Sequence, residues 1–255
     1  GVEHLRADIE ALAASFIDRM EPLGGTCDFA EVAMAYPLRV IMKMLGVPEE
    51  DEPLMLRLTQ QTLTSQDPEF QAQGGGSGNA MMEMAAYFMA MIAERRANPR
   101  GDLPSPVANA RIDGALPPHR DLFGIATAGH DTTSYAITGG LLALLENPAE
   151  LEKLRADPAL MPTAIEEILR WTTPVKHFCR TATENRPVAG KTVEAGDLLL
   201  LSYPSANRDE AVFEDAGRVC ITRRPNRQIA FGTGPHGGLG QYLARLELTA
   251  IFREF

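Results

Sequence analysis

The amino-acid pattern changes at Pro174, and this change limits the folds that the chain can adopt. Before it, apolar residues recur at steps of three and four, which is the spacing of a helix with one buried face. After it come short β-compatible segments separated by Gly and Pro. The sequence therefore predicts a mainly α protein with a small β portion. Residues 1–177 are expected to be mostly helical, 178–240 to form a small sheet and loops, and 241–255 to form a final helix.

Helix boundaries ahead of Pro174 follow from caps and breakers. Asp28 is a candidate N-cap, and Pro37 is expected to bend the helix that follows it. The Gly-rich stretch 71–80 predicts a flexible connector, and the two prolines in 98–106 predict a loop. Helices are expected at about 3–20, 28–45, 50–65, 81–96, 119–145, 148–156 and 161–172, and strands within 178–183, 192–193 and 198–203.

The charge balance argues against two broad classes of partner. The 255 residues contain 34 Asp and Glu against 24 Lys and Arg, a formal net charge of -10. Nucleic acids and anionic membranes are bound by cationic surfaces, so neither is expected as a partner. No apolar run approaches the roughly 18 residues of a membrane span. The chain shows no signal peptide, and its three cysteines form no disulfide framework and no CxxC spacing. A single cytoplasmic domain over 1–255 is therefore expected.

The helix expected at 119–145 contains the sequence AGHDTT at 128–133. Gly129 costs about 1 kcal/mol relative to Ala in a helix interior, and Thr132 can turn its hydroxyl to a backbone carbonyl. A helix can bend at such a point and leave a small polar pocket beside the Asp131 carboxylate. The alternative is an ordinary packing face of small hydroxyl residues, and the hexapeptide alone does not decide between the two.

Three further segments carry candidate functional groups. Glu167 and Arg170 are spaced to share one helix face. Arg180 lies just after the helical part, in the first segment of the expected sheet. There it can bind either a cofactor carboxylate or a surface aspartate. FGTGPHGGLG at 231–240 contains enough glycine for the backbone to approach a flat ligand closely. It does not predict a dinucleotide-binding loop, because no strand–loop–helix unit with a downstream acidic residue surrounds it.

In this order and spacing, the segments resemble motifs of the cytochrome P-450 family. AGHDTT resembles the oxygen-binding stretch of the family, and EILR at 167–170 resembles its Glu-x-x-Arg pair. Two later segments resemble the parts of the family that follow the Glu-x-x-Arg helix. The first is SYPSANRDEAVFED at 202–215. The second is FGTGPHGGLGQYLAR at 231–245, which resembles the haem-binding loop and helix. The amino-acid sequence of these segments is most similar to that of soluble bacterial members of the family that hydroxylate terpene-sized molecules. The resemblance implies a cytochrome P-450 fold, incomplete, with the chain truncated at both ends.

The resemblance implies haem as the cofactor and assigns roles around it. Ala128 and Gly129 would lie against the haem, Thr132 would bond the bound dioxygen, and Asp131 would help to deliver protons for O–O cleavage. The loop residue Phe231 would pack near the proximal sulfur.

Charged side chains are assigned two different tasks by the same resemblance. Arg180 and His236 would hold the haem propionates, since both can donate charged hydrogen bonds. Glu167 and Arg170, together with Arg218, would form a buried structural ion-pair network.

Position 238 departs from the family pattern. The family places its axial cysteine two residues after the histidine of the loop, whereas this chain has Gly238. The cysteines at 27, 179 and 220 do not stand at that position. The thiolate pushes electron density onto iron and favours O–O cleavage. The sequence therefore predicts no protein ligand for a metal.

The enzyme hypothesis is a monooxygenase that inserts one oxygen atom into a small apolar, terpene-like molecule. Its electrons would come from a ferredoxin-type donor. A basic cluster ahead of the glycine-rich loop can dock an acidic ferredoxin, or it can be an ordinary solvated loop. The cluster consists of Arg218, Arg223, Arg224 and Arg227.

Two other functions compete with this hypothesis. One is a cysteine-less scaffold or activator protein with no haem chemistry, as some P-450-like proteins are thought to activate glycosyltransferases. The other is haem binding through His236 or water, with at most peroxidase-like chemistry. The last is the least expected, because the resemblance already assigns His236 to a propionate.

Overall fold

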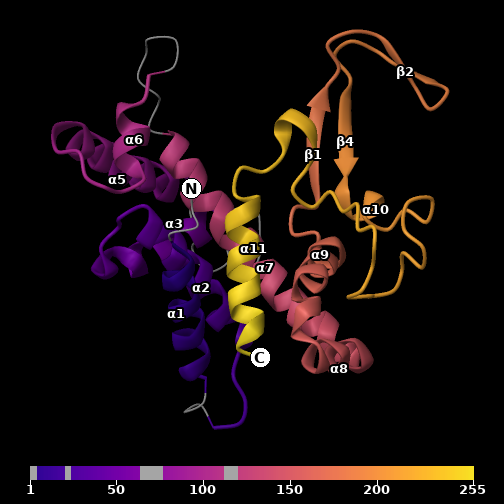
Figure 1. The fold of residues 1–255 in the computed structure, drawn as a ribbon. Helices are drawn as coiled ribbons and strands as arrows, with labels where there is room; N and C mark the ends of the chain where they lie inside the picture. The colour runs from indigo at the N-terminus through magenta and orange to yellow at the C-terminus, as the bar shows by residue number, and fades with distance from the viewer. Residues whose placement is uncertain (1–4, 21–23, 64–76, 112–119) are drawn as a thin grey trace. The chain divides into compact units, whose positions relative to one another are not determined.

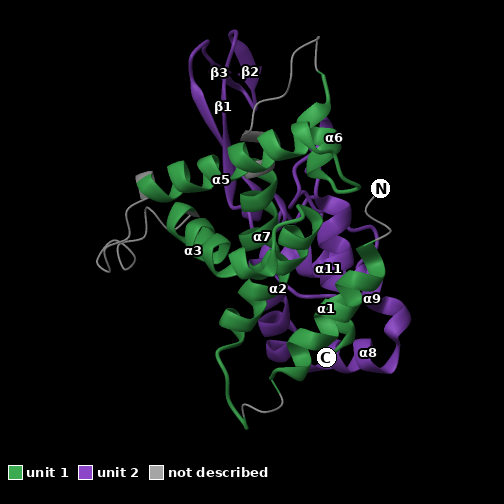
Figure 2. Cartoon of the chain, turned by 90° about the vertical axis from the view of Figure 1, so that its left-hand side faces the viewer, with its two compact units in different colours: residues 1–134, 250–255 green, residues 135–249 purple. Residues whose placement is uncertain are grey.

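The fold of the 255-residue chain was obtained as a computed structural model, which describes residues 5–20, 24–63, 77–111 and 120–255. The chain divides into two compact units, which Figure 2 shows in different colours. Unit 1 comprises residues 1–134 and 250–255, and unit 2 comprises residues 135–249. The prediction of a mainly α protein with a small β portion is confirmed. The single domain over 1–255 stays a prediction.

Unit 1 is built from helices (Figure 1). Its apolar core includes Ile9, Phe16, Tyr36 and Phe88, all of them buried. The rings of Phe16 and Tyr36 meet edge to face, with centroids 5.8 Å apart. The elements are α1 (Arg6–Asp18), α2 (Phe29–Met44), η3 (Glu49–Asp51), α3 (Glu52–Leu63), α5 (Ser77–Ala97), α6 (Pro104–Asn109) and the first part of α7 (Arg120–Glu146).

Helix α2 begins where its cap residue predicts. The side chain of Asp28 accepts a hydrogen bond from the Ala30 amide at 2.9 Å, which satisfies a donor that the helix leaves free. The helix continues through Pro37 to Met44, and the bend expected at Pro37 stays a prediction. It ends ahead of Gly46, whose φ of +63° lies in the left-handed region that glycine adopts readily.

Two predicted loops are wrong in part. Helix α6 begins at Pro104, inside the stretch 98–106, because proline in a first helical turn lacks only an N–H that the helix leaves free anyway. Helix α5 begins at Ser77, so the last residues of the predicted connector 71–80 are helical. Residues 71–76 of that connector lie outside the described part of the chain.

Unit 2 combines helices with two short antiparallel strand pairs. Strand β1 pairs with β4, where Cys179 lies opposite Leu200, and β2 pairs with β3, where Pro187 lies opposite Thr192. Besides the rest of α7, its elements are α8 (Pro148–Ala156), η4 (Pro158–Leu160), α9 (Met161–Thr172), β1 (His177–Thr181), β2 (Arg186–Val188), β3 (Lys191–Val193), β4 (Leu198–Ser202), α10 (Tyr203–Ala206), η5 (Gly234–His236) and most of α11 (Gln241–Arg253).

Four of these elements were not predicted, namely β2, α10 and the 3-10 helices η4 and η5. Strand β2 has three residues, Arg-Pro-Val, which is too short to show the alternation that marks a strand. Helix α10 is a single turn with Pro204 in its first turn, so it was assigned to the Gly- and Pro-rich loop. Short elements of this kind depend on tertiary contacts, whereas the longer α8 and α9 match the predicted ranges.

The cap of α2 gives a first testable prediction. Substitution Asp28→Ala should lower the free energy of unfolding by about 1 kcal/mol, because the Ala30 amide loses its acceptor. Chemical denaturation measures the difference. Asp28→Asn retains a side-chain acceptor and should change stability much less. Equal losses in the two variants would show that the side-chain oxygen of Asp28 does not cap the helix.

Candidate functional site

The AGHDTT segment is helical throughout and lies in α7. The Thr132 hydroxyl donates to the Ala128 carbonyl at 2.7 Å, which is the side-chain bond to the backbone that the sequence predicts. A Cβ atom on Gly129 would lie 2.7 Å from Cδ1 of Ile41, so glycine permits the close approach of α2 and α7 here. The haem-facing role of Ala128 and Gly129 stays a prediction.

His130 is a buried group in this segment that was not expected to take part. Its side chain is 0% exposed, and Nε2 lies 2.9 Å from the carbonyl oxygen of Met34 in α2. Its other ring nitrogen, Nδ1, lies 3.0 Å from Oδ1 of Asp131. Burial lowers the pKa of His130. Burial also raises the pKa of Asp131, an effect that the neighbouring ring partly opposes.

The predicted Glu167–Arg170 pair exists and is completely buried. Nε and Nη2 of Arg170 each donate to a Glu167 carboxylate oxygen at 2.8 Å, which is a bidentate contact. Nη1 and Nη2 of Arg170 also donate to three backbone carbonyls. These carbonyls belong to Asn207, Ala216 and Arg218, at 2.8 to 2.9 Å.

The third arginine of this network is Arg223, so the prediction of Arg218 is wrong. Arg223 is 9% exposed, and its Nε donates to Glu167 at 3.1 Å. The Arg218 side chain is 80% exposed and lies 3.7 Å from Asp215. Only the carbonyl of Arg218 joins the network, because the loop turns its backbone inward and its side chain outward. Arg223 is therefore not part of a basic surface, whereas Arg224 and Arg227 are exposed.

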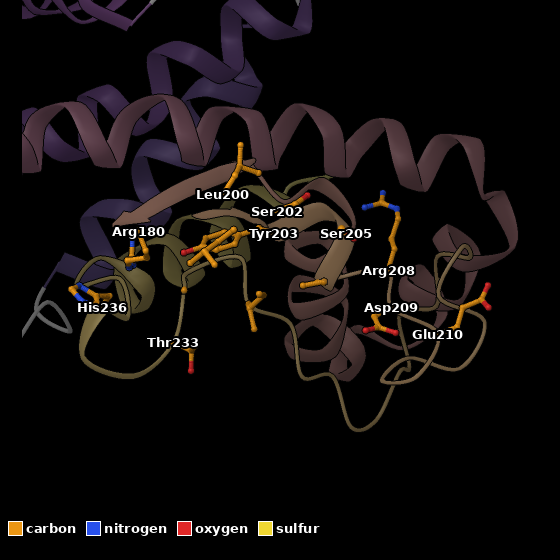
Figure 3. A pocket seen from close by; sticks show the side chains of 14 residues that line it. Arg180, Leu200, Ser202, Tyr203, Ser205, Arg208, Asp209, Glu210, Thr233 and His236 are labelled. Atoms are coloured by element: carbon orange, nitrogen blue, oxygen red, sulfur yellow. The ribbon is translucent and has the colours of Figure 1, made fainter. Parts of the chain in front are cut away.

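A cavity of about 920 Å³ lies within unit 2 (Figure 3). Arg180 of β1 and His236 of η5 both line it, and Figure 3 shows them at one end. The structure thus brings together two residues that the resemblance assigns to the same task. Tyr203 and Arg208 also line the cavity, and they were not expected from the sequence because α10, which contains Tyr203 and precedes Arg208, was not predicted.

The glycine-rich loop after strand β4 and helix α10 brings Phe231 and Gly238 together. The amide of Gly238 donates to the Phe231 carbonyl at 2.8 Å. A Cβ atom at position 238 would lie 3.4 Å from that carbonyl oxygen and 3.6 Å from the Phe231 Cβ, which are ordinary contact distances. The loop therefore has room for a Cβ atom at position 238, and glycine supplies none.

Arg245 of α11 contacts both this loop and helix α9. Its guanidinium lies over the Phe231 ring, 4.8 Å from the centroid, and Nη2 donates to Glu166 of α9 at 3.0 Å. Glu166 also accepts from the Gln228 amide at 3.0 Å. Although burial raises the pKa of Glu166, these two donors outweigh it and hold the pKa below its usual value.

Protein ligands for a metal ion are not grouped within the described ranges. No set of three His, Cys, Asp or Glu side chains there is placed to hold a metal ion. Cys27 and Cys179 are exposed, and Cys220 is partly buried in the loop beside Glu167. Within the same ranges, each helix is too short or too polar to cross a membrane.

Comparison with known proteins gives consistent matches along the chain. The family model described as Cytochrome P-450 matches residues 120–255. Cytochrome P-450-terp of Pseudomonas sp is 41% identical over 268 residues, which cover 99% of this chain and 63% of the relative. A steroid C26-monooxygenase of Mycobacterium tuberculosis is 38% identical over 264 residues, covering 98% of this chain and 64% of the relative.

Solved structures match equally well. CYP108D1 from Novosphingobium aromaticivorans is 41% identical with a TM-score of 0.88, covering 99% of this chain and 61% of that one. A cytochrome P-450 of Mycobacterium marinum in complex with pseudoionone is 34% identical with a TM-score of 0.93, covering 99% and 64%. The predicted fold, in incomplete form, is confirmed, and the chain spans less than two thirds of the length of these relatives.

The ion-pair network gives a second testable prediction. Arg223→Ala should lower the free energy of unfolding by about 2 kcal/mol, since it removes a charged hydrogen bond from the buried Glu167 carboxylate. The matched control Arg218→Ala removes an exposed side chain and should change stability by less than about 0.5 kcal/mol. Urea denaturation of both variants measures the difference. A larger loss in the Arg218 variant would contradict the assignment of Arg223.

Proposed function

Because the chain belongs to the cytochrome P-450 family, we propose that its function is that of a haem-dependent monooxygenase acting on a small apolar molecule, with the axial thiolate missing at Gly238. The observation that carries this proposal is the cavity in unit 2, where Arg180 and His236 lie at one end. Position 238 lies two residues after His236, in a loop that has room for a Cβ atom at this position.

The residues present fit one part of haem and not another. Propionates are anionic, and Arg180 and His236 can donate charged hydrogen bonds to them. A cavity of about 920 Å³ is within the size range of cofactor sites. Gly238, however, offers no side-chain atom to the iron. In this proposal Arg180 and His236 would hold the porphyrin edge, and position 238 would give the iron no thiolate to support oxygen insertion.

Asp131 and Thr132 are the residues proposed to act on the oxygen side. Haem, when bound with a thiolate, supplies the oxygen activation, and the chain supplies protons and orientation. Burial raises the pKa of Asp131, so its carboxyl holds a proton more readily than an exposed one. The Thr132 hydroxyl donates to Ala128, which leaves its oxygen able to accept a hydrogen bond.

Relatives favour an apolar substrate. The M. marinum structure holds pseudoionone, and the M. tuberculosis relative is named for a steroid, both of them largely apolar molecules. A ferredoxin-type electron donor is the proposed partner. The exposed Arg218, Arg224 and Arg227 offer a basic surface on a chain of formal net charge -10, and such a patch favours an acidic partner. A cytoplasmic location stays a prediction.

Gly238 itself favours a second candidate function. A cysteine-less scaffold or activator protein with no haem chemistry needs the fold but not an iron ligand. Cys220 enters the buried network around Glu167 only through its backbone amide, and the contacts of Arg245 with Phe231 and Glu166 use no cysteine. Such a protein would keep the loop that the structure has and would bind a protein partner instead of haem.

Substitution Gly238→Cys tests the proposed function. We expect the unaltered chain, reconstituted with haem, reduced and exposed to carbon monoxide, to show no absorption band of thiolate-ligated haem. The Gly238→Cys variant should show this band, because a Cβ atom at 238 meets its neighbours at 3.4 Å or more. Gly238→Ser is the matched control, with similar size and no thiolate.

The same spectra separate the two candidate functions. Haem uptake by both the unaltered chain and the variant, with the thiolate band in the variant only, supports the monooxygenase architecture. Haem uptake by neither supports the scaffold. A thiolate band in the unaltered chain, or haem uptake by the cysteine variant without that band, would overturn the proposed place of position 238.

A further inference from the structure

Tyr203 is a buried aromatic residue of the cavity in unit 2. It is 7% exposed, and it begins α10 directly after strand β4. It lines the same cavity as Arg180 and His236. Figure 3 shows Tyr203 on the side of the cavity where Arg180 lies, and Arg208 on the other side. The tyrosine therefore belongs to the end of the cavity that is proposed to hold the haem propionates.

Contacts with strand β1 hold Tyr203 in place. Its amide donates to the Lys176 carbonyl at 3.0 Å. Its ring meets the ring of Phe178 edge to face, with centroids 6.1 Å apart. Phe178 and Arg180 are two residues apart in β1, and alternate residues of a strand share one face. The ring of Tyr203 thus packs against the face of β1 that carries Arg180.

The hydroxyl of Tyr203 lies beside the glycine-rich loop. A Cβ atom at Gly232 would lie 3.5 Å from this hydroxyl oxygen and 3.1 Å from the carbonyl oxygen of His236. The tyrosine hydroxyl and the backbone of His236 therefore flank the same small space. Glycine at position 232 keeps this space free of a side chain.

Three side chains at this end of the cavity have hydrogen-bond donors that the protein does not use. Within the described ranges, the Tyr203 hydroxyl and the His236 ring have no hydrogen-bond partner. Arg180 donates there only to the carbonyl of Cys179, at 2.9 Å, although a guanidinium has five N–H donors. A buried tyrosine usually has a partner for its hydroxyl. A ligand that accepts hydrogen bonds would supply the missing partner for each of the three.

The charges around the tyrosine favour an anionic ligand. Arg180 and His236 are basic, whereas the acidic lining residues Asp209 and Glu210 lie at the other end of the cavity in Figure 3. Asp209 also accepts already from the Ala211 amide, at 2.9 Å. A carboxylate accepts only, and it binds most strongly to donors that are charged or convergent.

We propose that the Tyr203 hydroxyl is a third binding group for the porphyrin propionates, and that it donates to a carboxylate at the end of the cavity where Arg180 and His236 lie. Phe178 fixes the direction of the ring, and Gly232 leaves space beside the hydroxyl. This inference rests on the proposed function, in which haem occupies the cavity. It adds a neutral donor to the two basic residues and explains why the ring carries a hydroxyl.

Substitution Tyr203→Phe tests the inference, because it retains the ring and removes only the donor. The probe is protoporphyrin IX without iron, which has the propionates of haem and needs no ligand at position 238. The variant should raise the Kd at least about tenfold, since one hydrogen bond to a charged group is lost. Titration of the porphyrin fluorescence measures the Kd. Tyr135→Phe, at an exposed tyrosine of α7 outside the cavity lining, is the matched control and should leave the Kd unchanged.

Two further measurements distinguish a contact with the carboxylate from a structural role of Tyr203. The dimethyl ester of protoporphyrin IX carries no charge and accepts weaker hydrogen bonds. The ratio of the Kd of Tyr203→Phe to that of the unaltered chain should therefore be smaller with the ester. Without porphyrin, both proteins should have the same midpoint of urea denaturation, because the hydroxyl has no partner within the described ranges. A variant that is less stable or does not fold would overturn the inference.

The outcomes separate this inference from the proposed function. The role of Tyr203 would be overturned by equal protoporphyrin Kd values for the variant and the unaltered chain. An equal ratio with the ester, or no protoporphyrin binding at all, would overturn it as well. The proposed function is tested by the haem spectra of Gly238→Cys, which depend on iron and a thiolate. Those spectra can show the thiolate band even if Tyr203 binds no propionate.

Discussion

The buried guanidinium of Arg170 determines the path of the chain through unit 2. An arginine has five N–H donors and cannot lose its charge in a protein. In this structure all five are used, two on Glu167 and three on the carbonyls of Asn207, Ala216 and Arg218. Leaving such donors unpaired in the interior would cost several kcal/mol. The loop after α10 must therefore bring its backbone to α9.

Helix α9 holds both ends of the segment that contains Gly238. Glu167 accepts from the Cys220 amide and from Arg223 ahead of that segment. Its neighbour Glu166 accepts from Gln228 ahead of Gly238 and from Arg245 after it. Two adjacent carboxylates thus fix the loop through charged hydrogen bonds. None of these contacts involves position 238, so the loop keeps its form without an iron ligand.

The long helices could be predicted from the sequence, whereas contacts between residues far apart in the sequence could not. Helices α8 and α9 match their predicted ranges because caps, breakers and a 3.6-residue period act locally. The start of α6 at Pro104 was not predicted, since the effect of proline depends on whether its missing N–H was needed. The sequence also did not predict that the Arg223 side chain, and not that of Arg218, binds Glu167. Which side chain points inward depends on which backbone carbonyls accept hydrogen bonds from Arg170. His130 gave no local signal, because its partner Met34 lies on another helix.

The backbone conformation of this loop does not require glycine at position 238. At position 232, in contrast, glycine is favoured. Its φ of +75° disfavours a side chain, and a Cβ atom there would lie only 3.1 Å from the His236 carbonyl oxygen. Gly238 has no such φ, and a built Cβ atom meets only ordinary contacts. A residue with a side chain would also lose less backbone entropy on folding there. Glycine at 238 therefore removes a chemical group and leaves the fold around it intact, so the difference from the family pattern at this position is one of chemistry.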